Sequence, residues 1–427
     1  MMRRLLAAIL RMLYDYRDKI RSFQPNARLY LLNVALIGAA MGVYRLLFNF
    51  YVLSLGYDEA LLGRLVTVSS LTALLAALPM GYLADQIGRK GSLILSGALT
   101  CLSILVMVQF PGVTVFYLAN LLLGVAQSLG GVTTGPFLME NSSDHERTYL
   151  FSINSGLQMV SASVGNWIGG SLPGWLAGAL AASATSAAAY GAALALVALA
   201  GFASLLPLGF IRSPRLARSQ RSVFAPLSYA RRRPGELSRL ILPMLITSIG
   251  AGLIMPFMNV FFRQVHHQPD PTIGAMFAWG SLAMGVGLLA APPLADRMGK
   301  IQLVVVSQAL SIPFLVLLGF APLFWISAAA YYVRLALMNM SGPIYQTFVM
   351  EHAEQESRAT VASLVSMSWN FGWAFSPMIS GWLQVRYGFG PAFLGTIVLY
   401  TLSTVMYYVY FWRPARADLS ARPNQVS

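Results

Sequence analysis

The feature that most constrains this chain is a series of long apolar blocks. Each block approaches or exceeds the 20 or so residues that an α-helix needs to cross the hydrocarbon core of a bilayer. A soluble domain carries about 25% charged residues, whereas this chain has 10% charged and 57% hydrophobic residues. The blocks fall at 27–55, 58–82, 91–110, 112–139, 149–175, 185–211, 238–265, 272–295, 301–320, 322–350, 359–386 and 390–412. They predict an all-α membrane protein with twelve transmembrane helices and argue against a soluble enzyme.

The net charge of +14 follows from where the basic residues stand. All but five of the 29 Lys and Arg residues fall in the terminal segments, in alternate loops or at the helix ends beside them. The positive-inside rule places such segments in the cytoplasm. The exceptions are Arg45, Arg64, Arg263, Arg334 and Arg386. We therefore predict a multi-pass protein of the plasma membrane (the bacterial inner membrane) with both termini cytoplasmic, and no nucleic-acid partner.

Composition divides the chain into five segments. We expect residues 1–26 to form a cytoplasmic amphipathic segment on the membrane surface, with a disordered lead-in as an equal alternative. Residues 27–211 and 238–412 are the predicted N-terminal and C-terminal six-helix domains. The basic cytoplasmic linker at 212–237 contains seven arginines and is expected to rest on anionic lipid headgroups. Residues 413–427 are a predicted cytoplasmic tail.

The two predicted domains are related by one constant offset in sequence. Asp85, in the segment LADQIGR, corresponds to Asp296, in the segment LADRMGK, 211 positions later. Two further pairs keep this offset: Glu140 with Glu351 and Arg147 with Arg358. A single offset across separate motifs indicates duplicated halves of like topology. Transporters built in this way bind substrate near the bilayer midplane, between the repeats.

The segment GYLADQIGRK, from Gly81 to Lys90, resembles the signature of the major facilitator superfamily of transporters. It stands between the second and third predicted helices, where the family has it. A degenerate copy at residues 296–300 stands at the corresponding place in the second half. The resemblance covers residues 27–412 and implies the family's fold, with two pseudo-symmetric six-helix halves around a central cavity.

The resemblance also implies a cytoplasmic gate. In the family the signature acid caps the eleventh helix, from the opposite half, where the helix N-terminus is partly positive. Here Asp85 would meet the helix that opens near Ala359, and Asp296 the helix that opens near Thr148. Glu140 with Arg147, and Glu351 with Arg358, would complete each latch as charge pairs, the alternative being ordinary solvated loop charges. The predicted gate residues are Gly81, Asp85, Gly88, Arg89, Lys90, Glu140, Arg147, Asp296, Gly299, Lys300, Glu351 and Arg358.

Two helices depart from the family's patterns. Asn120 stands where many proton-coupled members carry an arginine, which argues against that form of proton coupling. In the fifth helix, Gly165, Gly169 and Gly170 partly match the antiporter signature, but its proline is missing. These glycines favour an exporter if they bend the helix, and simple helix packing otherwise.

Arg45 and Arg334 stand well inside predicted helices, whereas no Asp, Glu or His stands near mid-membrane. An intramembrane charge is costly and by default marks a functional site. Because a guanidinium bonds a carboxylate or phosphate through two N–H groups, we predict that they bind an anionic or zwitterionic substrate. Snorkelling or bonding to backbone carbonyls is the alternative. The other substrate-binding candidates are Asn49, Asn154, Gln158, Asn259, Trp369, Asn370 and Trp373.

The sequence offers no basis for catalysis or for a bound metal. Cys101 is the single cysteine, the four histidines lie in or near loops, and no nucleophile–base pair stands inside a predicted helix. We expect no catalytic residue, no metal, no cofactor and no enzyme activity. The expected partners of a monomer are membrane lipids and a small-molecule substrate, and a coupling ion is left open.

These features together predict a secondary transporter that moves a small organic solute across the plasma membrane by alternating access. The partial antiporter signature favours efflux of amphipathic compounds or metabolites. The alternative is an organic-anion or lipid carrier that uses the buried arginines. A remote alternative is a membrane sensor with the same fold that transports nothing, against which the short tails and linker argue.

Overall fold

The computed structural model describes residues 23–212, 234–352 and 358–413. Every regular element in this part of the chain is a helix. In lipid, backbone N–H and C=O groups must be paired internally, and a helix pairs them within one segment. The predicted all-α fold class is therefore confirmed. The predicted N-terminal amphipathic segment, the basic linker and the C-terminal tail lie almost entirely outside the described residues.

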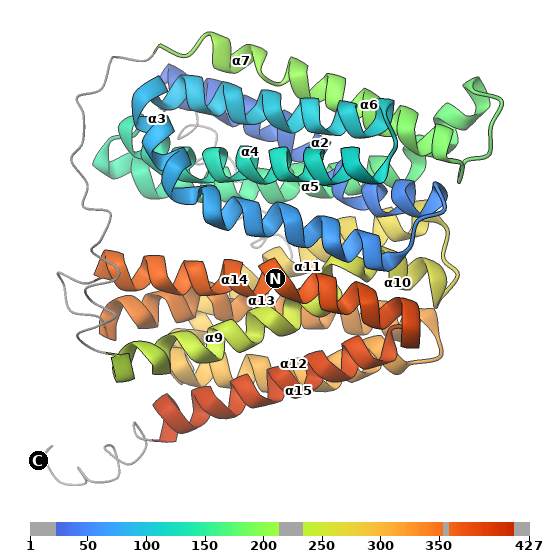
Figure 1. The fold of residues 1–427 in the computed structure, drawn as a ribbon. Coiled ribbons are helices and arrows are strands. Elements are labelled where there is room, and N and C mark those ends of the chain that lie inside the picture. Colours follow the sequence, from blue (N-terminus) through green and yellow to red (C-terminus); the bar gives the residue numbers. More distant parts are fainter. Residues whose placement is uncertain (1–22, 213–233, 353–357, 414–427) are drawn as a thin grey trace, which may run out of the picture.

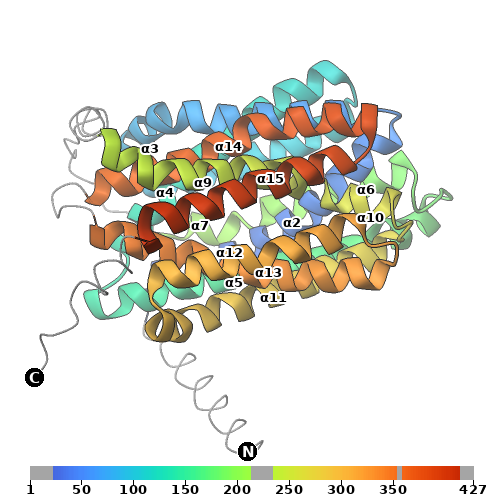
Figure 2. The ribbon, with the colours of Figure 1, turned by 90° about the horizontal axis from the view of Figure 1, so that it is seen from below.

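The helices form two layers that correspond to the two halves of the sequence (Figure 1). The first half contains α2 (Pro25–Ser54), α3 (Glu59–Gln109), α4 (Val113–Glu140), α5 (Asp144–Ala179), α6 (Ala187–Ala203) and α7 (Leu206–Gly209). The second half contains α9 (Pro234–Ile254), η1 (Met255–Phe257), α10 (Met258–Gln264), α11 (Asp270–Met298), α12 (Lys300–Phe320), α13 (Phe324–His352), α14 (Arg358–Tyr387), α15 (Gly390–Tyr407) and η2 (Tyr408–Trp412). Figure 2 shows that the helices of both halves run side by side along the bundle.

The long helix α3 contains two membrane passages that meet at Gly88. This glycine has φ +78°, a conformation that interrupts the helix and that residues with a Cβ rarely adopt. Gly299, 211 positions later, has φ +93° and separates α11 from α12. With α3 divided at Gly88, the described helices make twelve passages, consistent with the predicted number. Eight of the helical stretches are long and apolar enough to cross a membrane by length and composition.

The seventh passage is interrupted, which its apolar pattern did not indicate. The helix α9 ends at Ile254, a turn of 3-10 helix follows, and α10 begins at Met258. Pro256 lies in this turn and cannot donate a backbone hydrogen bond. The break leaves the carbonyl oxygen of Pro256 available to a side chain from the other half.

Each half is a bundle of its own, and two seams join the halves. In the first half α2 packs on α5 and α3 packs on α4, and in the second half α9 packs on α14 and α12 packs on α13. Between the halves, α3 packs on α14 and α5 packs on α11. The offset of 211 relates α3 to α11 and α5 to α14, so the two seams are equivalent contacts of the duplicated halves.

The two ends of the bundle are named here by the turns that they carry. We call the end that carries the turns at Gly88 and Gly299 the signature end. The other end, which carries the turns at residues 55–58 and 265–269, is called the closed end because side chains from both halves bond across it. These contacts delimit the central cavity described below.

Candidate functional site

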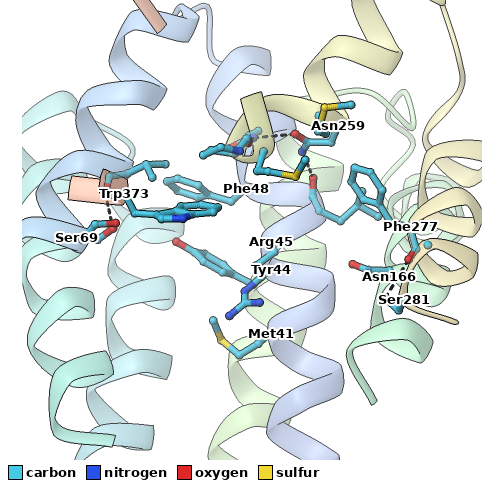
Figure 3. A pocket seen from close by; sticks show the side chains of 18 of the residues that line it. Met41, Tyr44, Arg45, Phe48, Ser69, Asn166, Asn259, Phe277, Ser281 and Trp373 are labelled. Atoms are coloured by element: carbon cyan, nitrogen blue, oxygen red, sulfur yellow. Dashed lines mark hydrogen bonds between the residues drawn. The ribbon is translucent and has the colours of Figure 1, made fainter. Parts of the chain in front are cut away.

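A cavity of about 570 Å³ lies between the two halves, within the range of about 300–1,000 Å³ typical of small-molecule sites. Nine helical elements from both halves contribute to its wall, and Figure 3 shows a part of it. The first half supplies Met41, Tyr44, Arg45, Leu46, Phe48, Asn49, Val66, Ser69, Ser70, Asn120, Leu123, Gln127 and Asn166. The second half supplies Met255, Pro256, Met258, Asn259, Phe277, Gly280, Ser281, Met284, Tyr331, Leu335 and Trp373.

Arg45 lies in this cavity and is exposed there. It stands nine residues before Ser54, so it is roughly 14 Å along the helix from the closed end of α2. Figure 3 shows its guanidinium beside Met41, on the side away from the closed end. Among the described residues, no carboxylate lies within ion-pair distance of Arg45. This side chain therefore presents an unneutralised positive charge to the cavity.

Arg334 has a different environment and does not line the cavity. It is 1% exposed, and its Nη2 donates to the hydroxyl of Tyr400 at 3.0 Å. The guanidinium lies 5.4 Å from the centroid of the Tyr400 ring, and its Nη1 lies 3.9 Å from the sulfur of Met255. Met255 lines the cavity, and so does Tyr331, which lies one turn before Arg334 on the same helix. Arg334 is therefore buried behind the cavity wall in this conformation, and the structure separates it from Arg45.

Asn49 and Asn259 line the cavity at its closed end and bond to each other. Asn49 Nδ2 donates to Asn259 Oδ1 at 2.8 Å and to the carbonyl of Pro256 at 2.7 Å. In return, Asn259 Nδ2 donates to the carbonyl of Leu46 at 2.8 Å. Both side chains are nearly buried, at 5% and 3% exposed. These two predicted substrate ligands thus form a reciprocal amide contact between the halves, which we call the asparagine clasp.

Of the remaining predicted substrate residues, one lines the cavity and the others lie elsewhere in the bundle. Trp373 lines the cavity, and its buried Nε1 has no hydrogen-bond partner among the described residues. Trp369 and Asn370 do not line it, and the carbonyl of Trp369 accepts a hydrogen bond from Ser248. Asn154 and Gln158 also lie away from the cavity lining, on α5.

The glycines of α5 pack this helix closely against its neighbours. A Cβ on Gly165 would meet the carbonyl oxygen of Ala39 on α2 at 2.0 Å, and a Cβ on Gly170 would meet the carbonyl of Asp270 on α11 at 2.6 Å. The helix itself continues without interruption from Asp144 to Ala179. These contacts support the packing interpretation of the partial antiporter signature.

Several cavity residues were not among the predicted ligands: Tyr44, Gln127, Asn166, Tyr331 and the four methionines Met41, Met255, Met258 and Met284. Asn120, noted only as a departure from the family pattern, also lines the cavity. Its Nδ2 donates to the carbonyl of Phe116 at 2.9 Å. The polar residues in this group were detectable as polar side chains in apolar helices, but a methionine in a membrane helix carries no such signal.

A second contact between the halves closes the same end. Tyr190 of α6 donates a hydrogen bond of 2.5 Å to Asp270 Oδ2, at the start of α11. Arg263 lies 3.7 Å from Asp270 Oδ1 and stacks over the Phe50 ring at 4.5 Å from its centroid. Gln264 also donates to Glu59 across the halves at 2.5 Å. The sequence did not indicate this contact, in which Asp270 is 8% exposed between the halves.

At the signature end, the observed ion pairs of the predicted gate residues lie within each half. Arg89 contacts Asp85 at 2.9 Å and Glu140 at 3.1 Å, and Lys300 contacts Glu351. In this conformation Asp85 and Glu140 are thus bonded to Arg89, and Glu351 is bonded to Lys300. The side chain of Arg358 lies outside the described residues. So do the side chains at the two helix starts, near Ala359 and Thr148, where Asp85 and Asp296 were expected to dock.

Comparison with known proteins agrees with this architecture. A family model described as Major Facilitator Superfamily matches residues 30–365 and 240–426. The multidrug resistance protein MdtG of Salmonella paratyphi C (strain RKS4594) is 24% identical over 410 residues, covering 92% of this chain and 96% of that protein. Human solute carrier family 2, facilitated glucose transporter member 12, is 35% identical over 107 residues, which is 24% of this chain and only 17% of that transporter.

A solved structure shows the same fold over almost the whole chain. The crystal structure of a bacterial homologue of the human lysosomal transporter Spinster, in an inward-facing and unoccupied conformation, superposes with a TM-score of 0.76 at 14% identity. The match covers 90% of this chain and 97% of that one. Proteins of this family and fold are membrane transporters and not enzymes. The chain therefore belongs to the major facilitator superfamily.

Proposed function

We propose that this protein exports amphipathic organic compounds from the cytoplasm, by alternating access of the central cavity across the bacterial inner membrane. The signature end is cytoplasmic in this proposal, as the basic residues favour. The present conformation then faces inward, with the asparagine clasp and the Tyr190–Asp270 contact closing the periplasmic side. The single observation that carries the proposal is a drug-sized cavity walled by both halves. Among the described residues, the hydrogen bonds that cross between the halves lie away from the signature end.

Export of amphipathic compounds is favoured by two observations, the first of which bears on direction and the second on the kind of ligand. Relatives similar over nine-tenths of this chain are multidrug resistance proteins, at 24–25% identity. The cavity wall combines methionines and aromatic rings with a few polar groups, and flexible methionine surfaces suit hydrophobic ligands of varied shape. A second candidate, carriage of an organic anion or a lipid headgroup, is favoured by Arg45 alone.

The proposal is tested by transport in everted membrane vesicles from cells that express the full chain. Accumulation of a fluorescent amphipathic dye is expected to exceed that of vesicles without the protein. Asn49→Cys and Asn259→Cys, in a Cys101→Ser background, place two thiols at the clasp. A short thiol-specific cross-linker is expected to stop accumulation in this variant, and to leave either single-cysteine variant active. Transport that continues after verified cross-linking would contradict alternating access through this cavity.

A further inference from the structure

The two halves contribute different chemistry to the cavity wall. The first half supplies the cation Arg45 and the amides Asn120, Gln127 and Asn166. The second half supplies mainly apolar surface, including the side chains of Met284 and Phe277. A ligand that spans the cavity therefore meets a cation and several amides on the first half. On the second half it meets mainly apolar groups, together with Asn259, Ser281 and Trp373.

The charge of the cavity has one sign. No Asp or Glu is among the residues that line it, so Arg45 is the one ionised side chain of the described wall. Arg45 is exposed in this cavity, and a ligand of opposite charge can pair with it there. A lipophilic cation would instead be repelled by Arg45 and would find no counter-charge.

The unfilled hydrogen-bonding groups point to the same ligand chemistry. The guanidinium of Arg45 carries five N–H donors in a planar fork, and no hydrogen bond joins it to a described residue. A second unfilled donor, the indole Nε1 of Trp373, is buried in the wall of the second half. Donors without partners suit a ligand rich in acceptors, and a carboxylate or phosphate accepts two parallel bonds from one arginine.

Building on the proposed transport function, we propose that the cavity binds a single-chain amphipathic organic acid, with its acid group on Arg45 and its apolar body against the methionines and aromatic rings of the second half. The volume of about 570 Å³ is that of a drug-sized site, so a free organic acid fits this assignment and a two-chain phospholipid does not. The ligand then touches both halves at once. Its head is held by the first half and its tail by the second.

The test measures binding to the purified full chain with probes that share one C10 chain and differ only in the head group. Decanoate and decyl phosphate carry a negative charge, decanol carries none, and decyltrimethylammonium carries a positive charge. Binding is followed by thermal stabilisation, because a ligand of the folded state raises its apparent stability. The two acids are expected to bind at least tenfold more tightly than the cation.

The variants Arg45→Gln and Arg45→Lys locate the head group. The glutamine variant is expected to lose on the order of 10- to 100-fold in affinity for decanoate while retaining its affinity for decanol. The lysine variant keeps the charge without the fork and is expected to retain part of the preference. Arg64→Gln is the matched control, because Arg64 bonds the carbonyl of Ala60 and does not line the cavity.

Three results would overturn this inference. They are equal affinity of the wild type for the C10 acid and the C10 cation, an unchanged preference for acids in Arg45→Gln, and displacement of decanoate by dioleoyl phosphatidate at equal concentration. The proposed transport function is judged separately by the dye measurement in vesicles. Dye transport without any acid preference refutes the inference and leaves the function standing. Arg45-dependent binding of decanoate without transport of any probe refutes the function instead.

Discussion

Removal of the asparagine clasp should shift the protein towards a state that is open at the closed end. The change Asn49→Ala deletes two hydrogen bonds between the halves, to Asn259 Oδ1 and to the carbonyl of Pro256. A side-chain hydrogen bond contributes about 0.6 kcal/mol in a membrane protein and about 1 kcal/mol in soluble proteins. The change therefore destabilises the closed arrangement by about 1–2 kcal/mol, which corresponds to roughly a tenfold rise in the open-to-closed ratio.

The assay is a distance distribution between spin labels on the two halves at the closed end. Ala184→Cys and Val265→Cys, in a Cys101→Ser background, are suitable because both positions are exposed and lie in loops of opposite halves. We expect Asn49→Ala to increase the population at longer distances. Asn259→Ala combined with Asn49→Ala should add less than the sum of the single changes, because the two residues share a contact.

The control for this prediction is another buried asparagine of the same helix. Asn33 donates to the carbonyl of Ser204 at 2.7 Å, within the first half. Asn33→Ala removes a similar hydrogen bond and should lower thermal stability without lengthening the distance between the labels. If Asn33→Ala and Asn49→Ala change the distance distribution equally, the clasp is not a gate.

Three further predictions concern individual residues. Tyr190→Phe removes the hydroxyl that bonds buried Asp270. In the same spin-label assay, this change should raise the population that is open at the closed end by about tenfold. An unchanged distance distribution would contradict a gating role. Gly88→Ala places a Cβ at φ +78° and should lower the free energy of unfolding by about 1–2 kcal/mol. Gly91→Ala lies in regular helix and should not lower it. Thermal melts of the two variants compare their stabilities. Burial lowers the pKa of His266, so the unfolded chain binds a proton more readily than the folded one. Stability should therefore decline as the pH falls below about 6.5, and His266→Leu should flatten this dependence in melts recorded from pH 5 to 8.

Length and pattern of the apolar blocks were sufficient to predict the helices, and the loop motifs were sufficient to predict their duplication. The offset of 211 positions, read from loop motifs, reappears as the pair of positive φ angles at Gly88 and Gly299. The break at Pro256 was not predicted, since a proline within an apolar run is compatible with both a continuous and a broken membrane helix. In this structure the helix is broken, and the carbonyl of Pro256 accepts a hydrogen bond from Asn49 of the other half.

The composition of the site was harder to predict because it depends on how each helix is rotated about its axis. Arg45 and Arg334 are equivalent as arginines within apolar sequence, yet one lines the cavity and the other is buried against Tyr400. Asn154 and Gln158 share a face of α5 with the small residues that pack against α2, so that face is turned away from the cavity lining. Rotation is set by contacts between helices, which a single sequence does not contain.

The strength of the seam between the halves is suited to a structure that must open. Seven hydrogen bonds cross between the halves among the described residues, and none of them lies at the signature end. At about 0.6 kcal/mol each they contribute about 4 kcal/mol to closure. A ligand must favour one state by about 5.5 kcal/mol to reverse a 1:99 equilibrium, so a contribution of this size can be overcome by differential binding.

The observed ion pairs at the signature end lie within the halves, so they do not oppose this motion. A ligand held by its head on the first half and by its tail on the second would then act directly on the equilibrium between the two states, because its affinity depends on how the halves are placed.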